Sequence, residues 1–252
     1  MKQKKAWCFL CITIIVSIGA NVPPDEEVVG DERFVNVGVI DKFLRHMENT
    51  KPDNCSLENL GPGVVQGLAR ERFKQQAMTA VSRANLLTYL WKHNPETLNN
   101  QAVLYMLVTN LVESDEQIFA AGNCYDSQQF NGSGIFCPYG YKDPHSGNII
   151  VKDLAKTHGY DDINNTDYDW FHEIRQMGVN IALNIHLREM ASFIFHLPDD
   201  DRARIYKSLL VKYEDGHWSL PYYDCGGGNI WMITYTVPFF GYDDKLERYV
   251  FK

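Results

Sequence analysis

The chain has 252 residues, of which 45% are hydrophobic and 13% aromatic, enough to bury one sizeable core. Its formal net charge of −8 disfavours nucleic acid and anionic glycans as general partners. The composition therefore indicates a globular protein that does not bind nucleic acid.

A secretory signal peptide is predicted over residues 1–20. Three lysines within the first five residues precede an uncharged run from Ala6 to Ala20, and we expect cleavage near Gly19 or Ala20. An uncleaved anchor is the alternative, although the run is short for a membrane span of about 20 residues. Cleavage takes 24 basic residues to 21 against 32 acidic ones, so the formal net charge falls from −8 to −11.

Four cysteines remain after removal of residues 1–20: Cys55, Cys124, Cys137 and Cys225. An even number in an exported chain predicts two disulfides, among three formal connectivities. We favour Cys124–Cys137, which closes a short loop, and Cys55–Cys225, which ties the N-terminal segment to a C-terminal hairpin. In the chain-entropy model, the two disulfides raise the free energy of unfolding by about 3 and 5 kcal/mol, respectively. Zinc binding is the rival interpretation, but these four cysteines show no C-x-x-C spacing and the histidines show no H-x-x-x-H spacing.

Glycosylation is predicted at three N-x-S/T triplets, all in expected loops. The acceptor residues are Asn54, Asn131 and Asn164.

The first half of the chain is predicted to be mainly helical. Residues 21–50 are acidic, contain proline and are expected to form a loosely tethered entry segment before a domain over residues 51–252. No proline interrupts Gly63–Asn94, where apolar residues recur at helical spacing and predict one helix of about 30 residues. Pro95 ends it, and a second helix is predicted over Asn100–Ser114.

A disulfide-clipped hairpin is predicted next. The composition of Ile118–Tyr125 predicts a strand, and that of Ile135–Tyr141 predicts its hairpin partner. The polar residues between them are expected to form the turn. The disulfide between Cys124 and Cys137 would hold this hairpin as a rigid, exposed element.

The following segment is predicted to be helical again. Asp167 or Asp169 is expected to cap a short helix that carries Trp170, and the stretch Met177–Leu210 suggests two more helices separated by Pro198. We expect no closing strand between the polar turn at residues 242–245 and Lys252. Long helices followed by antiparallel strands predict an α+β fold.

The stretch His217–Gly241 predicts strand, turn, strand, and the chain is arranged around it. Pro221 interrupts the first arm, so this arm suits a sheet edge. The run Gly226–Asn229 supplies the reversal. The second arm, Ile230–Phe240, is rich in β-branched and aromatic residues on both faces, so both faces are expected to be buried.

Tyr222 and Asp224 share one face of the first arm, because side chains alternate along a strand. A carboxylate beside a phenol ring is a pair that can hold an ammonium group through a charge-assisted hydrogen bond and a cation–π contact. The competing interpretation is that Asp224 accepts turn hydrogen bonds and Tyr222 packs.

No catalytic or metal-binding pattern supports an enzyme. A G-x-S-x-G motif is absent, the histidines lack ligand spacing, and Gly226–Gly228 lacks the Lys-Ser/Thr pair of a phosphate loop. We therefore predict no enzymatic activity, no cofactor and no metal. A secreted hydrolase of unrecognised type is kept only as a third, remote hypothesis.

The segment Trp218–Cys225, with the pattern W-S-x-P-Y-x-[acid]-C, is the most specific part of a family resemblance. Together with the triplet Asn54–Ser56 and the order of helices and hairpin, it resembles the extracellular Cache domain of the orphan-type class C G-protein-coupled receptors that include the metabotropic glycine receptor. The similarity is greatest to an invertebrate member and covers about residues 50 to 241. It implies a PAS-like antiparallel sheet flanked by long helices, and it supports the Cys55–Cys225 pairing.

The resemblance also implies a ligand site. The family's pocket tyrosine matches Tyr222, and its pocket acid matches Asp224, which is one methylene shorter. Where the family has a serine–arginine pair that grips the ligand carboxylate, this chain has Phe119-Ala120, and Arg83 is the weak substitute. A further strand with the family's last pocket acid is expected after Lys252, so the chain is expected to be truncated before a transmembrane region.

The leading hypothesis is the ligand-sensing ectodomain of a class C receptor, binding a small amine or amino acid at Tyr222 and Asp224 with aromatic support from Trp218. The resemblance implies a homodimer in the full receptor. The alternative is an extracellular protein-interaction module with a vestigial pocket, which would meet a protein partner through the Cys124–Cys137 hairpin. Both hypotheses predict that the protein enters the secretory pathway. A full-length receptor would lie on the outer side of the cell membrane, and a chain that ends at Lys252 would be secreted.

Overall fold

The structure is a computed structural model, and it describes residues 10–17, 72–125, 129–130, 134–158, 169–184, 188, 190–197, 200–219, 222–224 and 230–251. Several predictions lie outside these residues: the cleavage point, the entry segment over residues 21–50, the Cys55–Cys225 disulfide, the three glycosylation sites and the Gly226–Asn229 turn. These stay predictions.

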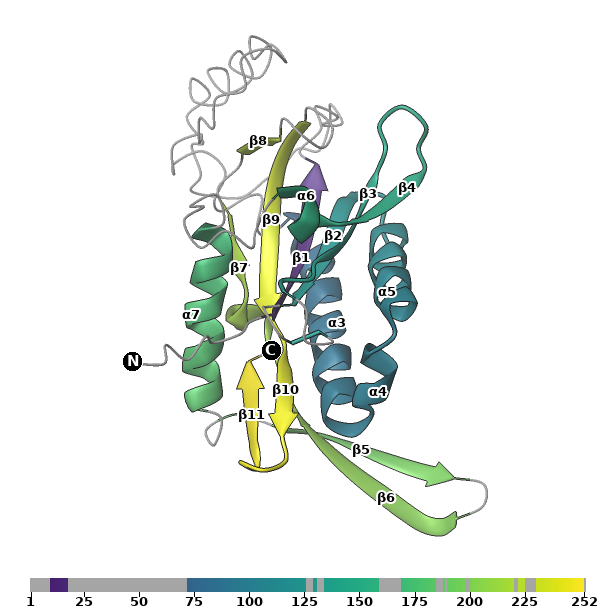
Figure 1. The fold of residues 1–252 in the computed structure, drawn as a ribbon, viewed down its shortest axis with the longest axis vertical. Coiled ribbons are helices and arrows are strands. Elements are labelled where there is room, and N and C mark those ends of the chain that lie inside the picture. The colour runs from purple at the N-terminus through teal and green to yellow at the C-terminus, as the bar shows by residue number, and fades with distance from the viewer. Residues whose placement is uncertain are drawn as a thin grey trace, which may run out of the picture.

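A seven-stranded antiparallel sheet forms the centre of the molecule (Figure 1). The strand order is β4-β3-β2-β1-β9-β7, and β8 also pairs with β9. The strands are β1 (Leu10–Ser17), β2 (Ile118–Tyr125), β3 (Pro138–Lys142), β4 (Ile149–Asp153), β7 (His217–Trp218), β8 (Tyr222–Asp224) and β9 (Ile230–Pro238).

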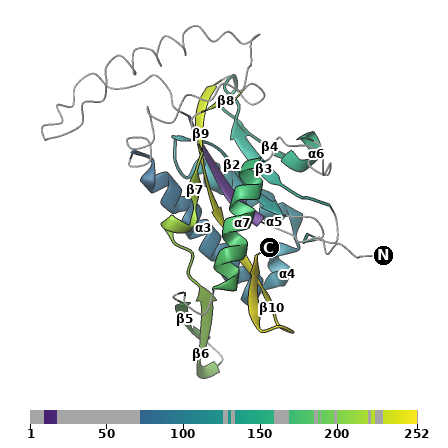
Figure 2. The same cartoon turned by 90° about the vertical axis from the view of Figure 1, so that its left-hand side faces the viewer.

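Helices cover both faces of this sheet. In Figures 1 and 2, α3 and α5 lie on one side of the strands and α7 on the other. The helices are α3 (Lys74–His93), α4 (Pro95–Leu98), α5 (Gln101–Glu113), α6 (Leu154–His158) and α7 (Asp169–Leu183). The predicted α+β class is confirmed, since long helices precede and flank antiparallel strands.

The second predicted helix is present as α5, whereas the first, expected over Gly63–Asn94, is present as α3 only from Lys74, because Phe73 is the N-cap residue. One face of α3 is buried at helical spacing, with Ala77, Ala80, Ala84 and Leu87 fully shielded from solvent. Asn100 caps α5, since its Oδ1 accepts a hydrogen bond from the Ala102 backbone N–H at 3.0 Å.

The β2–β3 hairpin and its disulfide are present, but the hairpin is not exposed. Cys124 and Cys137 are joined, with their Cα atoms 3.9 Å apart. Every residue of β2 is buried. The sequence interpretation was wrong on exposure because β2 lies inside a wider sheet, between β3 and β1, and alternation alone does not show how many neighbours a strand has.

The stretch Met177–Leu210 departs most from its prediction. The helix α7 continues to Leu183, and a hairpin of β5 (Met190–Leu197) and β6 (Asp200–Leu209) replaces the two predicted helices. This hairpin projects from the body in Figure 1. Its aromatic residues Phe193 and Tyr206 pack on Tyr89 and His93 of α3, a tertiary contact that the local apolar spacing did not reveal.

The C-terminal end also differs. After the turn at residues 244–247, β11 (Arg248–Phe251) pairs with β10 (Phe240–Asp243), so the expectation of no strand after the polar turn is wrong. The final segment is only four residues long, and Glu247 takes the positive φ of 46° that lets the chain reverse.

The segment Leu10–Ser17, inside the predicted signal peptide, occupies an internal sheet position as β1. It pairs antiparallel with β2 on one side and with β9 on the other. Among the residues described, no helix is both long and apolar enough to cross a membrane.

Candidate ligand-binding site

The β7–β8 arm lies along the outer edge of β9, as the interrupted first arm predicted. Trp218 pairs with Tyr235, and the three residues of β8 pair with Met232, Trp231 and Ile230. The arm is anchored between these two ladders: the Ser219 backbone N–H donates to the Thr234 carbonyl at 2.8 Å, and the Thr234 N–H donates to Ser219 Oγ at 2.9 Å.

The register fixes the sheet face on which the candidate positions lie. Tyr222 stands opposite Met232, and Asp224 stands opposite Ile230. Residues directly opposite in an antiparallel pair share a face. Tyr222 and Asp224 therefore occupy positions on the Met232 face of the sheet.

That face carries an apolar cluster separate from the main core. Met232 is buried together with Phe119, Ala120 and Tyr139 of β2 and β3. The ring of Tyr139 packs closely on β2, because a Cβ added at Gly122 would lie 3.3 Å from Tyr139 Cδ2. The main core lies on the other face, because Ile233, the residue after Met232, belongs to it.

Phe119 and Ala120, which stand where the family has its serine–arginine pair, thus lie in this cluster. Phe119 is 8% exposed and Ala120 is fully buried, so this part of the face is apolar. The structure brings them to the sheet face that also holds the Tyr222 and Asp224 positions.

Trp218 belongs to the opposite face. It is 7% exposed, its Nε1–H donates to Tyr213 Oη at 2.9 Å, and its ring lies 5.0 Å from that of Tyr235. Tyr235 in turn stacks on Tyr213 at 5.4 Å and donates to the Tyr213 carbonyl at 2.7 Å. Trp218 therefore packs beneath the arm, and the structure does not bring it together with Tyr222 and Asp224.

Arg83 also lies away from these positions. Its Nη2 donates to Asn110 Oδ1 of α5 at 2.6 Å, which places the guanidinium between the two helices. Partial burial there lowers its pKa from the usual range. Because α3 and α5 cover the main-core face, Arg83 is separated by the sheet from the Met232 face.

Sequence reasoning missed the ion pair that holds the start of the arm. Asp215, in the one-turn 3₁₀ helix Tyr213–Asp215, is buried, pairs with Arg188, and accepts from the Lys212 backbone N–H at 2.8 Å. The Asp215-Gly216 dipeptide before His217 was the local sign of this turn.

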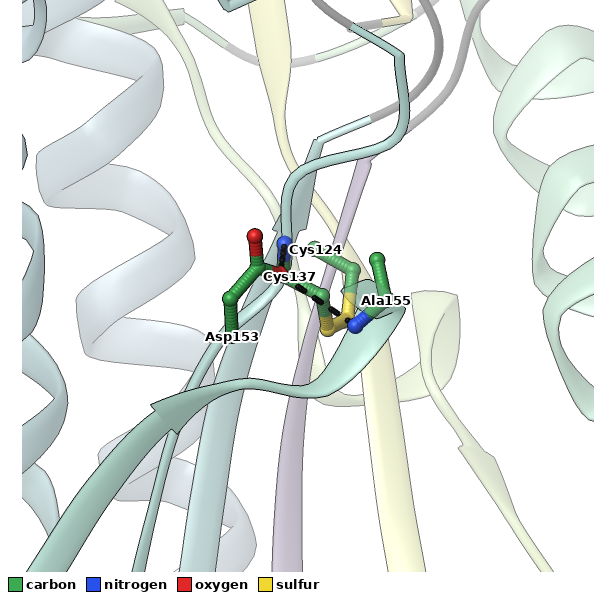
Figure 3. Close-up of a disulfide and its surroundings, with 4 residues drawn as sticks. All are labelled: Cys124, Cys137, Asp153 and Ala155. Atoms are coloured by element: carbon green, nitrogen blue, oxygen red, sulfur yellow. Dashed lines mark hydrogen bonds between the residues drawn. A yellow bond between two sulfur atoms is a disulfide. The ribbon is translucent and has the colours of Figure 1, made fainter. Parts of the chain in front are cut away.

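A second network fixes β4 and the disulfide (Figure 3). Asp153 Oδ1 accepts from the backbone N–H of Cys137 at 3.0 Å and from that of Ala155 at 3.2 Å. The same carboxylate therefore caps α6 and fixes the backbone of Cys137, next to the disulfide. Among the described residues, no group of three His, Cys, Asp or Glu side chains is placed to hold a metal.

Comparison with known proteins bears on this region directly. Residues 199–246 match the family model described as methyl-accepting chemotaxis protein-like, first PDC sensor domain. The α+β fold, with an N-terminal helix packed on antiparallel sheets, is consistent with that of a PDC/Cache sensor domain. The matched stretch runs from β6 through β10 and includes the β7–β8 arm, so the family pattern covers the candidate site.

A solved structure is also similar to this chain. A crystal structure of the extracellular domain of the proposed histidine kinase soHK1S-Z6 is 18% identical, with a TM-score of 0.43. The alignment covers 84% of this chain and 59% of that chain. No curated protein matches the sequence. The similarity to a known family therefore lies in residues 199–246, which resemble a PDC sensor domain of the methyl-accepting chemotaxis protein-like kind.

Proposed function

We propose that this PDC/Cache domain is the ligand-sensing ectodomain of a class C G-protein-coupled receptor and that it binds a small amine or amino acid at Tyr222 and Asp224. The observation that carries the proposal is the register of β8 on β9, which puts both positions on the Met232 face. The class C assignment rests on the sequence resemblance, which the W-S-x-P-Y-x-[acid]-C segment supports.

The spacing of the two residues suits one ammonium group. Positions two apart on a strand are separated by about 6.6 Å, so a cation between them is within reach of both side chains. A carboxylate supplies a charge-assisted hydrogen bond, and a tyrosine ring supplies a cation–π face.

The neighbouring cluster bears on the rest of the ligand. Phe119, Ala120 and Met232 offer apolar contact and no positive charge, and Arg83 is engaged with Asn110 behind the sheet. A ligand carboxylate buried there without a cation would be costly. The proposed site therefore favours an amine with an apolar body over glycine.

Signalling would follow from a shift between two arrangements of the domain. A ligand that contacts both β8 and the Met232 cluster stabilises the arrangement in which the two are close, and a population shift of this kind is transmitted across a receptor dimer. The proposed location is the outer side of the cell membrane.

The ligand chemistry is tested with matched compounds. Thermal shift of the purified domain is measured with primary amines, the same amines acetylated on nitrogen, and the amino acids with the same side chains. We expect stabilisation by the free amines, none by the acetylated forms, and less by the amino acids. Equal responses to free and acetylated amines would show that no ammonium is recognised.

The second candidate function is a protein-interaction module. The sequence feature behind it is Phe119-Ala120 in place of a cationic pair, and both residues lie in the apolar cluster around Met232. The Cys124–Cys137 hairpin that was expected to meet the partner is not an exposed element, since every residue of β2 is buried. The structure instead exposes Ile194 and Ile205, a directly opposed pair on β5–β6, at 62% and 65%. Loss of binding to a cell-surface partner in Ile194→Lys, with an unchanged amine response, would favour this candidate.

A further inference from the structure

The two faces of the β5–β6 hairpin have different surroundings. Phe193 and Tyr206 stand directly opposite each other and pack on Tyr89 of α3, with ring centroids 4.8 and 6.4 Å away. The neighbouring pair, Ile194 and Ile205, therefore lies on the other face. Its side chains are 62% and 65% exposed, so the hairpin presents an apolar pair to solvent where it projects from the body (Figure 1).

The outer edge of β6 is held by α3 and β11. The Lys207 carbonyl accepts a hydrogen bond from His93 Nε2 at 3.1 Å and another from Tyr249 Oη at 3.3 Å. These two donors use both lone pairs of the oxygen. Lys207 and Ser192, which stand opposite each other, are therefore a non-hydrogen-bonded pair of the ladder, in which both residues turn their backbone groups outward.

The outer edge of β5 is open to a further strand. By alternation from Ser192, Met190 and Ile194 also direct their N–H and C=O groups to this edge. Within the part of the chain that the structure describes, β6 is the one strand paired with β5, and their register is regular from Met190 to Phe195. Solvent-facing edges are usually blunted by charged residues or proline. Residues 190–197 contain no proline and no Asp, Glu, Lys or Arg, so this edge is suited to pairing.

The residues behind this edge indicate the chemistry of a strand that would add to it. Lys207 is exposed and shares a face with Ile194, and the side chain in front of it, Ser192, is small. Neighbouring strands lie about 4.8 Å apart, a distance that the four-carbon stem of a lysine spans. The Lys207 ammonium can therefore pair with a carboxylate opposite Ser192, and an apolar side chain opposite Ile194 would cover the exposed isoleucine pair.

We propose that the outer edge of β5 is a strand-addition site for a partner protein. The partner supplies an extended segment antiparallel to β5, with an apolar residue opposite Ile194 and an acidic residue opposite Ser192. A second copy of β5 has no acidic residue to meet Lys207, and two chains with a formal net charge of −8 repel each other. The proposal rests on the second candidate function, for which it gives the mode of binding, and is independent of the amine site.

The probe is a blocked synthetic peptide, Thr-Val-Thr-Glu-Thr-Val, whose first valine and glutamate match the positions opposite Ile194 and Ser192. Its matched control carries lysine in place of glutamate. Binding to the purified domain is followed by NMR at millimolar peptide concentration. We expect the glutamate peptide to slow amide exchange at Ser192 and Ile194 about 10-fold. The lysine peptide should bind about three- to fivefold more weakly, as expected for one exposed ion pair.

Two variants test the ion pair and the backbone pairing separately. Lys207→Glu should reverse the preference between the two peptides, because it changes the side chain and keeps the carbonyl that holds the hairpin. Ser192→Pro removes one outward N–H and no hydrogen bond to β6, so it should abolish binding of both peptides. Both variants should keep the amine response of the wild-type domain.

Four results would overturn the proposal. Two are the absence of peptide binding by the wild-type domain and equal binding of the two peptides. The third is peptide binding that persists in Ser192→Pro, which would place the peptide elsewhere. The fourth is a dimer of the free domain that Ser192→Pro dissociates, which would assign the edge to a second copy. Loss of a cell-surface partner in Ile194→Lys but not in Ser192→Pro would keep the second candidate function and contradict strand addition alone.

Discussion

At the scale of single residues, Asp153 at the end of β4 joins two neighbouring elements. Its Oδ1 accepts hydrogen bonds from Cys137, the residue before β3, and from Ala155 in the first turn of α6, and its side chain is buried. A buried acceptor shared by two backbone donors leaves both donors unsatisfied when it is removed.

We therefore expect Asp153→Ala to lower the free energy of unfolding by about 2 kcal/mol, and Asp153→Asn, which keeps an oxygen acceptor, to lower it by less than about 1 kcal/mol. Urea denaturation followed by circular dichroism measures both. Equal losses in the two variants would contradict the role of Oδ1 as an acceptor.

The candidate site shows how far single residues could be predicted. The shared face of Tyr222 and Asp224 followed from strand alternation alone. The separation of Trp218 and Arg83 from that face did not, because it depends on which neighbour each contacts: Trp218 pairs with Tyr235, and Arg83 reaches Asn110. Both contacts are set by tertiary packing.

At the scale of elements, the helices α3 and α5 and the strands β2 and β9 follow from local pattern. Their apolar periodicity is strong, and Asn100 and Pro95 mark boundaries chemically. The β5–β6 hairpin was missed because its exposed residues Ile194 and Ile205 weaken the strand alternation, and its packing partner α3 lies about a hundred residues earlier in the chain.

The contact of this hairpin with α3 is expected to depend on pH. His93 packs against the rings of Tyr89 and Tyr206, with ring centroids 4.8 Å away in each case. Its Nε2 lies 3.1 Å from the Lys207 carbonyl. Burial, together with the charge of Lys92, lowers the pKa of His93 below its ordinary value of 6.5, despite the opposing hydrogen bond to Lys207.

Because the folded-state pKa lies below the unfolded one, the unfolded chain binds the proton more readily. Stability is therefore expected to be retained above pH 6.5 and to fall as the pH drops through 6.5 toward the lower folded pKa. Urea titrations at pH 7, 6 and 5 measure this slope, and His93→Gln, which keeps an N–H donor but does not titrate in this range, should flatten it. An unchanged slope in His93→Gln would assign the pH dependence to other groups.

At the scale of the whole molecule, the α+β class and the antiparallel pairing were predictable, but the sheet order was not. The order depends on which strand stands between β2 and β9, and that place is held by Leu10–Ser17, a segment whose composition indicates a signal peptide. Local pattern does not distinguish an apolar segment that is removed on export from one that completes a sheet.

The proposed ligand-sensing function depends on recognition of an ammonium group at β8. Its most direct test is titration calorimetry of the best amine from the thermal-shift series against the wild-type domain and against Asp224→Asn, which removes the charge and keeps the size. The account predicts a loss of affinity of about 10- to 100-fold in Asp224→Asn, as expected for one charge-assisted hydrogen bond. An affinity equal to that of the wild-type domain would contradict it.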